Sequence, residues 1–130
     1  MEIVVRIVCF ALGYLLGLIQ TSYIYGKLHG IDIREHGSGN AGTTNALRVL
    51  GKRAGLVVFL GDLMKAAIAC IAARYIGVHY FPDIVYPMIL WAGFGVVIGH
   101  NYPFYMNFKG GKGIAATAGV ILGILDWRII

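Results

Sequence analysis

Apolar residues occur along this chain in four runs that are separated by short polar segments. Residues 3–25 and 54–76 are each close to the roughly 20 apolar residues that an α-helix needs to cross a bilayer. The run at 84–99 is short for a crossing, and the run at 114–125 is long enough only for a half-helix. The pattern predicts an all-α fold, a polytopic integral membrane helical bundle with about four hydrophobic helices, in one membrane domain over residues 1–130.

The composition supports a membrane protein. Hydrophobic residues make up 58% of the chain and charged residues 13%, about half the charged share of a soluble domain. A small soluble domain has too little interior to bury so many apolar side chains. Cys9 and Cys70 fall inside apolar runs, which predicts buried thiols, and no cysteine–histidine spacing typical of a metal site is present.

The distribution of basic residues predicts the orientation in the membrane. The polar region at 27–53 is rich in lysine and arginine, whereas Arg6 alone lies on the opposite flank of the first run. Basic loops face the cytoplasm, so we expect the N-terminus outside and the 27–53 region inside. The third span then returns inward and brings residues 100–113 to the same cytoplasmic side. We interpret the net charge of +5 as loop lysines and arginines that face the cytoplasm or anionic lipid, and we expect no nucleic-acid binding.

The segment from Ser38 to Arg48 reads Ser-Gly-Asn-Ala-Gly-Thr-Thr-Asn-Ala-Leu-Arg. Small hydroxyl and amide residues around glycines can form a tight turn with several inward-facing donors. Residues 45–50 then predict a short helix, and donors at a helix N-terminus favour an anion. An ordinary surface turn has the same composition, so this segment alone supports both interpretations equally.

The segment from His100 to Gly113 contains one histidine, two lysines and three glycines. Glycines let the backbone approach a ligand and form a concave nest of N–H groups, and lysine adds a compact positive charge. The segment is not a Walker A motif, because no glycine stands at the required upstream offset. His100 either caps the end of a helix or contacts a substrate near neutral pH.

Two features inside the spans predict how the helices pack. Gly13 and Gly17 form a small-xxx-small pair, which favours close approach of another helix. Asp62 and Lys65 lie three residues apart, so they share one helix face and can pair. A charge in a membrane helix costs at least about 2.5 kcal/mol, so the pair either locks helix packing or orients the cytoplasmic loops from behind. We favour support over direct chemistry, because we expect both residues below the mouth of the site.

Three motifs, in this order, resemble the bacterial PlsY family of membrane glycerol-3-phosphate acyltransferases. They are Ser38-Gly39-Asn40-x-Gly42-x-Thr44-Asn45 with Arg48, then Gly55 through Leu60-x-Asp62-x-x-Lys65, and then Gly99-His100-x-x-Pro103 through Phe108-Lys109-Gly110-Gly111-Lys112-Gly113. One small departure is Ala66, where the family usually has glycine.

The resemblance implies transfer of a fatty acyl group from acyl phosphate to the 1-hydroxyl of sn-glycerol 3-phosphate. The products are lysophosphatidic acid and phosphate, in phospholipid biosynthesis and without a cofactor. It implies a multi-pass protein of the bacterial inner membrane with cytoplasmic active-site loops. Its partners are then the two substrates, membrane lipid and the acyl-phosphate-forming enzyme.

The resemblance also implies roles for individual residues. The polar centre around glycerol 3-phosphate comprises Ser38, Asn40, Arg48 and Lys112. The acyl-phosphate cradle comprises Gly42, Thr44, Gly110 and Gly111, and the binding set also includes Asn45 and Lys109. The catalytic candidates are Ser38, Asn40 and His100, with Asp62 and Lys65 as structural support. No general base is obvious. An acyl phosphate is already activated, so positioning and charge neutralisation can supply most of the rate, with the departing phosphate accepting the proton. His100 is the rival base.

Two expectations qualify this interpretation. The family adds further helices and a C-terminal His-x-x-Asn, whereas this chain continues from the fourth run only into Asp126-Trp127-Arg128 and ends at Ile130. We therefore expect a fragment or a truncated product. The competing class is a transporter or binding subunit for phosphorylated solutes, with Asp62 and Lys65 on its pathway. The position of the donor-rich motifs at the cytoplasmic mouth argues against it, since transporters bind near the midplane.

Overall fold

The computed structural model describes residues 1–125, and every regular element in this range is helical. The α-helices are α1 (Glu2–Gly17), α2 (Thr21–Leu28), α3 (Thr43–Leu50), α4 (Lys52–Tyr80), α5 (Val85–Asn101) and α6 (Ile114–Ile124), and the short 3₁₀ turns are η1 (Ile33–Glu35), η2 (Pro82–Ile84) and η3 (Phe104–Met106). The expected Asp126-Trp127-Arg128 segment lies outside the described residues.

Three helical segments are long and apolar enough to cross a membrane: Glu2–Leu28, Lys52–Tyr80 and Pro82–Met106. The shorter apolar helix is α6, as the sequence predicted for a half-helix. The all-α membrane fold is thus confirmed. The number of spans in the bundle and the outside location of the N-terminus stay predictions.

The first span, Glu2–Leu28, agrees with the expectation for residues 3–25, but it is interrupted within its length. Helix α1 ends at Gly17 and α2 begins at Thr21. The carbonyls exposed at this break are bonded by side chains from elsewhere in the chain. Lys65 donates to the carbonyl oxygens of Gly17 and Ile19, and the Tyr105 hydroxyl donates to that of Leu18. The break is stable because these backbone carbonyls keep hydrogen-bond partners.

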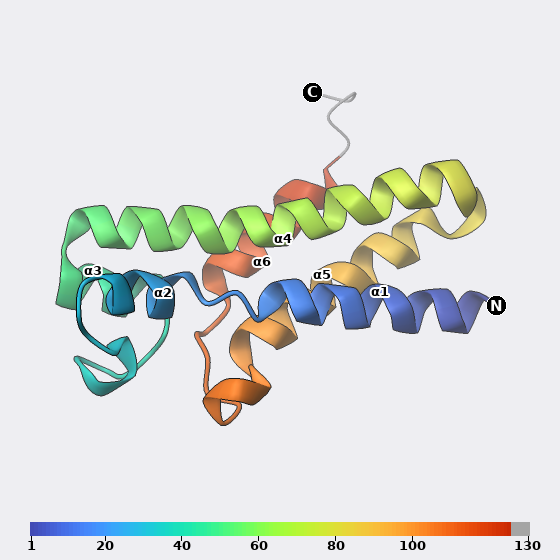
Figure 1. Ribbon diagram of the computed structural model, residues 1–130. Helices are drawn as coiled ribbons and strands as arrows, with labels where there is room; N and C mark the ends of the chain where they lie inside the picture. The colour runs from blue at the N-terminus through green and yellow to red at the C-terminus, as the bar shows by residue number, and fades with distance from the viewer. Residues whose placement is uncertain (126–130) are drawn as a thin grey trace.

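Helices α1 and α5 lie side by side and run in the same direction (Figure 1). Gly13 and Gly17 on α1 each face a backbone carbonyl of α5, and Gly95 and Gly99 on α5 each face a carbonyl of α1. A Cβ at any of these four positions would collide with the facing carbonyl oxygen. The close packing predicted for Gly13 and Gly17 is confirmed, and the matching pair on α5 makes it reciprocal.

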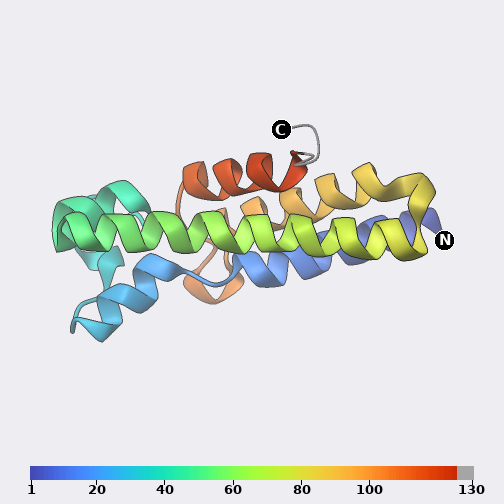
Figure 2. The same cartoon turned by 90° about the horizontal axis from the view of Figure 1, so that it is seen from above.

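Helix α6 packs along α4 with the help of two further glycines (Figure 2). A Cβ at Gly119 would collide with the backbone of α4, and one at Gly123 would collide with Cys70. The Arg74 guanidinium of α4 donates to the carbonyls of Gly123 and Ile124 at the end of α6, which satisfies acceptors that a helix C-terminus leaves open. Cys9 and Cys70 are buried free thiols, as predicted.

The two polar segments of the chain lie toward the same end of the bundle (Figure 1). Helices α2 and α3, with η1 between them, cover the start of α4, and the loop after α5 folds back toward them. This arrangement follows from the antiparallel course of the long helices, which returns the chain to the same end after α5. The fold therefore brings the two motif-bearing segments to one site.

Candidate active site

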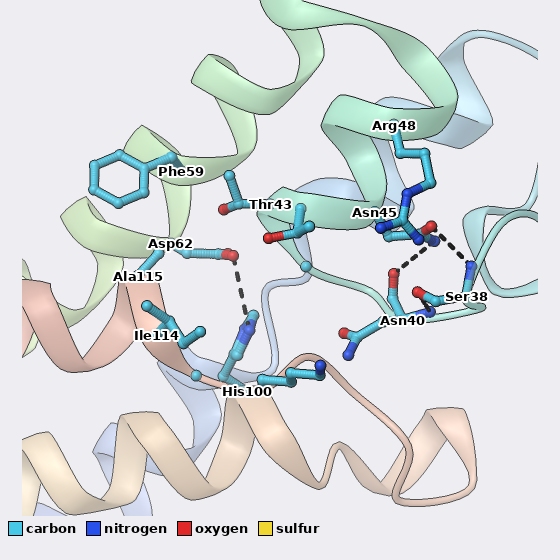
Figure 3. A pocket seen from close by; sticks show the side chains of 14 residues that line it. Ser38, Asn40, Thr43, Asn45, Arg48, Phe59, Asp62, His100, Ile114 and Ala115 are labelled. Atoms are coloured by element: carbon cyan, nitrogen blue, oxygen red, sulfur yellow. Dashed lines mark hydrogen bonds and ion pairs between the residues drawn. The ribbon is translucent and has the colours of Figure 1, made fainter.

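A cavity of about 280 Å³ lies between the two polar segments (Figure 3). Its wall combines α3 and the loop before it, the first turns of α4, the end of α5 and the start of α6. The lining residues are Ser38, Asn40, Gly42, Thr43, Thr44, Asn45, Arg48, Phe59, Asp62, His100, Lys112, Gly113, Ile114 and Ala115. Residues far apart in sequence thus meet in one hollow of the size that suits a small ligand.

Asn45 organises the loop that precedes α3. Its side chain is buried, and its Oδ1 accepts a hydrogen bond of 3.0 Å from the backbone N–H of Ser38. Its Nδ2 donates to the carbonyl oxygens of Asn40 (3.0 Å), His36 (3.1 Å) and Ile33 (3.4 Å). These bonds occupy both ends of the amide. Asn45 therefore fixes the path of the loop and has little capacity left for a ligand.

The start of α3 presents hydrogen-bonding groups to the cavity. Gly42 is the N-cap residue and makes no side-chain cap, so the first N–H groups of α3 are available to an anion. The Thr43 hydroxyl and the Asn40 amide oxygen are buried side-chain atoms without a hydrogen-bond partner among the described residues. Buried polar groups ordinarily have partners, so these two are candidates for contact with a bound molecule. Ser38 also lines this region, and its hydroxyl accepts from the N–H of Asn40.

Gly110 and Gly111 shape the second loop without lining the cavity. The N–H of Gly110 donates to the Asn101 carbonyl (2.8 Å), and the N–H of Gly111 donates to that of His100 (3.2 Å). A Cβ on Gly110 would collide with the His100 carbonyl, and one on Gly111 would collide with the His100 ring. The two glycines thus let the loop fold back against α5. This fold places Lys112 at the cavity.

Lys109 does not line the cavity although it lies only three residues before Lys112. It borders a separate depression of about 240 Å³ together with Asp32, Arg34 and Glu35. There Arg34 pairs with Asp32 at 2.7 Å and holds the pKa of that carboxyl down at about 2. The two lysines of this loop therefore have different surroundings.

Asp62, Lys65 and His100 form a buried cluster behind and beside the cavity, each at most 5% exposed. Lys65 Nζ lies 3.3 Å from Asp62 Oδ1, which confirms the predicted pairing, and 2.8 Å from His100 Nδ1. His100 Nε2 lies 3.7 Å from Asp62 Oδ2 (Figure 3). Asp62 lines the cavity wall, whereas Lys65 is not among the lining residues. That both charges act as support below the mouth of the site stays a prediction. Gln20 donates to the His100 carbonyl and anchors the α1–α2 break to the end of α5.

One wall of the cavity is apolar. Phe59 from α4 faces Ile114 and Ala115 from the start of α6 (Figure 3). Sequence reasoning did not include these three residues or Thr43. The position of Phe59, three residues before Asp62 on the same helix face, was the available signal. A cavity with cationic groups on one side and this wall on the other suits a molecule that carries a phosphate next to an apolar chain.

A family model described as glycerol-3-phosphate acyltransferase matches residues 7–130 of the chain. A glycerol-3-phosphate acyltransferase of Exiguobacterium sibiricum is 49% identical over 112 residues, which cover 85% of this chain and 51% of that relative. One of Clostridioides difficile is 46% identical over 133 residues, with 95% of this chain and 61% of the relative covered. The chain thus spans about half the length of the curated relatives it matches.

Solved structures give the same result. The crystal structure of the integral membrane glycerol 3-phosphate acyltransferase PlsY in its glycerol 3-phosphate form is similar with a TM-score of 0.77 and 38% identity. The match covers 92% of this chain and 57% of that one. Its lysophosphatidic acid form gives a TM-score of 0.75. On the family model and these relatives, the chain belongs to the glycerol-3-phosphate acyltransferase family.

Proposed function

We propose that this chain forms the phosphate-binding site of a membrane acyltransferase that moves a fatty acyl group from acyl phosphate to the 1-hydroxyl of sn-glycerol 3-phosphate. The observation that carries the proposal is the cavity itself. Arg48 reaches it from α3 and Lys112 from the loop after α5, the N-terminus of α3 opens into it, and an apolar wall closes one side. The related PlsY structures in glycerol 3-phosphate and lysophosphatidic acid forms support glycerol 3-phosphate as a substrate and lysophosphatidic acid as the product.

The residues of the cavity suit two phosphorylated substrates. Arg48 and Lys112 offset the charge of glycerol 3-phosphate, with Ser38 and Asn40 bonding its hydroxyl groups. The acyl phosphate lies at the start of α3, where Gly42 and Thr44, together with Thr43, offer N–H and hydroxyl donors. The acyl chain extends past the apolar wall toward lipid.

The other members of the expected site act through the backbone or lie outside. Asn45, Gly110 and Gly111 hold the two loops in shape, and Lys109 does not contact substrate. Asp62 borders the cavity and pairs with Lys65 and His100. These assignments rest on which side chains line the cavity and which are already engaged.

The reaction requires little chemistry from the protein. The 1-hydroxyl oxygen attacks the acyl carbonyl carbon, a new ester C–O bond forms, and the bond between that carbon and the phosphate oxygen breaks. The departing phosphate takes the hydroxyl proton. Positioning of the two substrates and stabilisation of the developing negative charge supply the rate.

The proposal places the site at the cytoplasmic face of a bacterial inner membrane, in phospholipid biosynthesis. Both loops belong to the side that carries most of the basic residues, as the positive-inside rule requires. Acyl phosphate would then be delivered from the same side by the enzyme that forms it.

Reconstitution of the intact protein into liposomes tests the proposal. Radiolabelled glycerol 3-phosphate should become extractable into organic solvent when acyl phosphate is present, with one phosphate released per acyl group transferred. Acyl coenzyme A should give no product. Uptake of label without conversion would instead identify a transporter, and equal rates with both donors would contradict the acyl-phosphate assignment.

A further inference from the structure

Lys65 has three hydrogen-bond acceptors around its amine. Nζ lies 3.1 Å from the Gly17 carbonyl oxygen, 2.6 Å from that of Ile19 and 2.8 Å from His100 Nδ1. A lysine ammonium has three protons to donate and no lone pair to accept with. The three contacts use all of its protons. The His100 contact then requires that Nδ1 be the acceptor.

The tautomer of the His100 ring follows from this contact. If Nδ1 accepts from Lys65, the ring proton of the neutral imidazole is on Nε2. Asp62 favours the same arrangement, because its Oδ1 lies 3.3 Å from Lys65 Nζ and its Oδ2 lies 3.7 Å from His100 Nε2. The reverse arrangement, with an uncharged Lys65 and a proton on Nδ1, would lose the ion pair and turn the Nε2 lone pair toward a carboxylate.

We infer that Lys65 is a positioning residue that fixes His100 as a hydrogen-bond donor toward the cavity. His100 lines the cavity, and the Nε2 edge of its ring lies beside Gly111 in the loop after α5. The ring has no free lone pair with which to take a proton from substrate. His100 therefore donates through Nε2–H to a substrate oxygen, and it does not act as the general base. This inference rests on the proposed function and assigns the histidine's part in it.

The same ammonium connects the ring to the break in the first span. Gly17 ends α1 and Ile19 lies in the segment before α2, so one side chain holds both the break and the ring. The charged groups that face His100 are Asp62 and Lys65 of α4, with Lys112 and Arg48 on the same cavity. The α1–α2 segment faces it with uncharged Gln20, which bonds the His100 carbonyl.

Substitution of His100 distinguishes a donor from a base. The glutamine amide can donate from a position near that of Nε2, but it cannot accept a proton. We expect His100→Gln to stay within about tenfold of the wild-type kcat, whereas His100→Ala should lose about 10²-fold or more, as loss of an oriented donor does. Equal, severe losses in both variants would overturn the donor assignment, because loss of a base affects both alike.

A pH profile tests the function of Lys65. In Lys65→Met, Nδ1 is released and His100 can be protonated, so a new dependence of kcat on pH should appear between about pH 5 and 8. The double variant Lys65→Met/His100→Gln should lack it. A lysine that served only to hold the helix break would lower activity equally at every pH, and that result would overturn the inference.

The tautomer can also be measured without activity. Nitrogen-15 NMR of the intact protein with labelled histidine shows which ring nitrogen carries the proton, and the signal missing in His100→Gln identifies His100. We expect a proton on Nε2 and none on Nδ1 from about pH 6 to 8 without substrate. A proton on Nδ1 would overturn the inference. This measurement decides the tautomer even if acyl transfer is not observed, and it needs no Lys65 variant to fold.

Discussion

Replacing Lys112 by glutamine should lower kcat/KM for glycerol 3-phosphate by about 10²–10³-fold in the acyl-transfer assay. Lys112 lines the cavity together with the start of α3, and it belongs to the loop that contains Gly110 and Gly111. Where negative charge develops in a transition state, removal of one positioned donor lowers the rate by about 10²–10³-fold. Glutamine keeps most of the side-chain length, so the loss reports the charge. Steady-state rates with varied glycerol 3-phosphate give the value.

Lys109→Gln is the matched control, since it makes the same change three residues earlier in the same loop. Both lysines are exposed, but Lys112 lines the cavity whereas Lys109 borders the depression with Asp32 and Arg34. Outside the cavity, a contact between exposed charges is worth about 0.2–1 kcal/mol, so we expect Lys109→Gln to change the rate by no more than about fivefold. Comparable losses in the two variants would contradict the placement of the phosphate site.

Replacing Gly99 by leucine should destabilise the bundle by about 3 kcal/mol or more, the upper part of the range for overpacking. A Cβ at Gly99 would collide with the Tyr14 carbonyl oxygen of α1. Because the atoms it would meet belong to the α1 backbone, no side-chain rotation can make room. The helices must separate to admit the side chain. The shift would also displace His100, the next residue of α5. Thermal unfolding in detergent, followed by the fraction of monodisperse protein, measures the effect.

Leu90→Phe adds bulk on the same helix at a position that is 54% exposed among the described residues. It should unfold near the wild-type temperature. Wild-type stability in Gly99→Leu would show that α1 and α5 do not pack through their glycines.

Much of the fold could be predicted from hydrophobic pattern and glycine spacing. The spans follow from run length, and the Gly13–Gly17 pair indicated the packing face correctly. The break after Gly17 could not be predicted, because no proline or charge marks it. It depends on donors that Lys65 and Tyr105 bring from elsewhere in the chain.

In the candidate site, too, some features could be predicted from the sequence and others could not. Motif spacing placed Arg48 and Lys112 together, and both line the cavity. Motif spacing did not show that Lys112 lines the cavity whereas Lys109 borders a different depression. It also did not show that the Asn45 side chain makes its hydrogen bonds within its own loop. Residue type indicates what a side chain can bind. Which lysine of this loop lines the cavity depends on how Gly110 and Gly111 let the loop fold back against α5.

Equilibrium binding of radiolabelled glycerol 3-phosphate to the intact protein, without acyl donor, tests the central claim that the cavity between the two loops is the phosphate site. Both Arg48 and Arg53, five residues along, are exposed, but Arg48 lines the cavity and Arg53 does not. Charge-assisted hydrogen bonds contribute roughly 1.5–3 kcal/mol, so Arg48→Gln should weaken binding by about tenfold or more while Arg53→Gln stays near wild type. Equal affinities in the two variants, or unchanged binding in Arg48→Gln, would contradict the account.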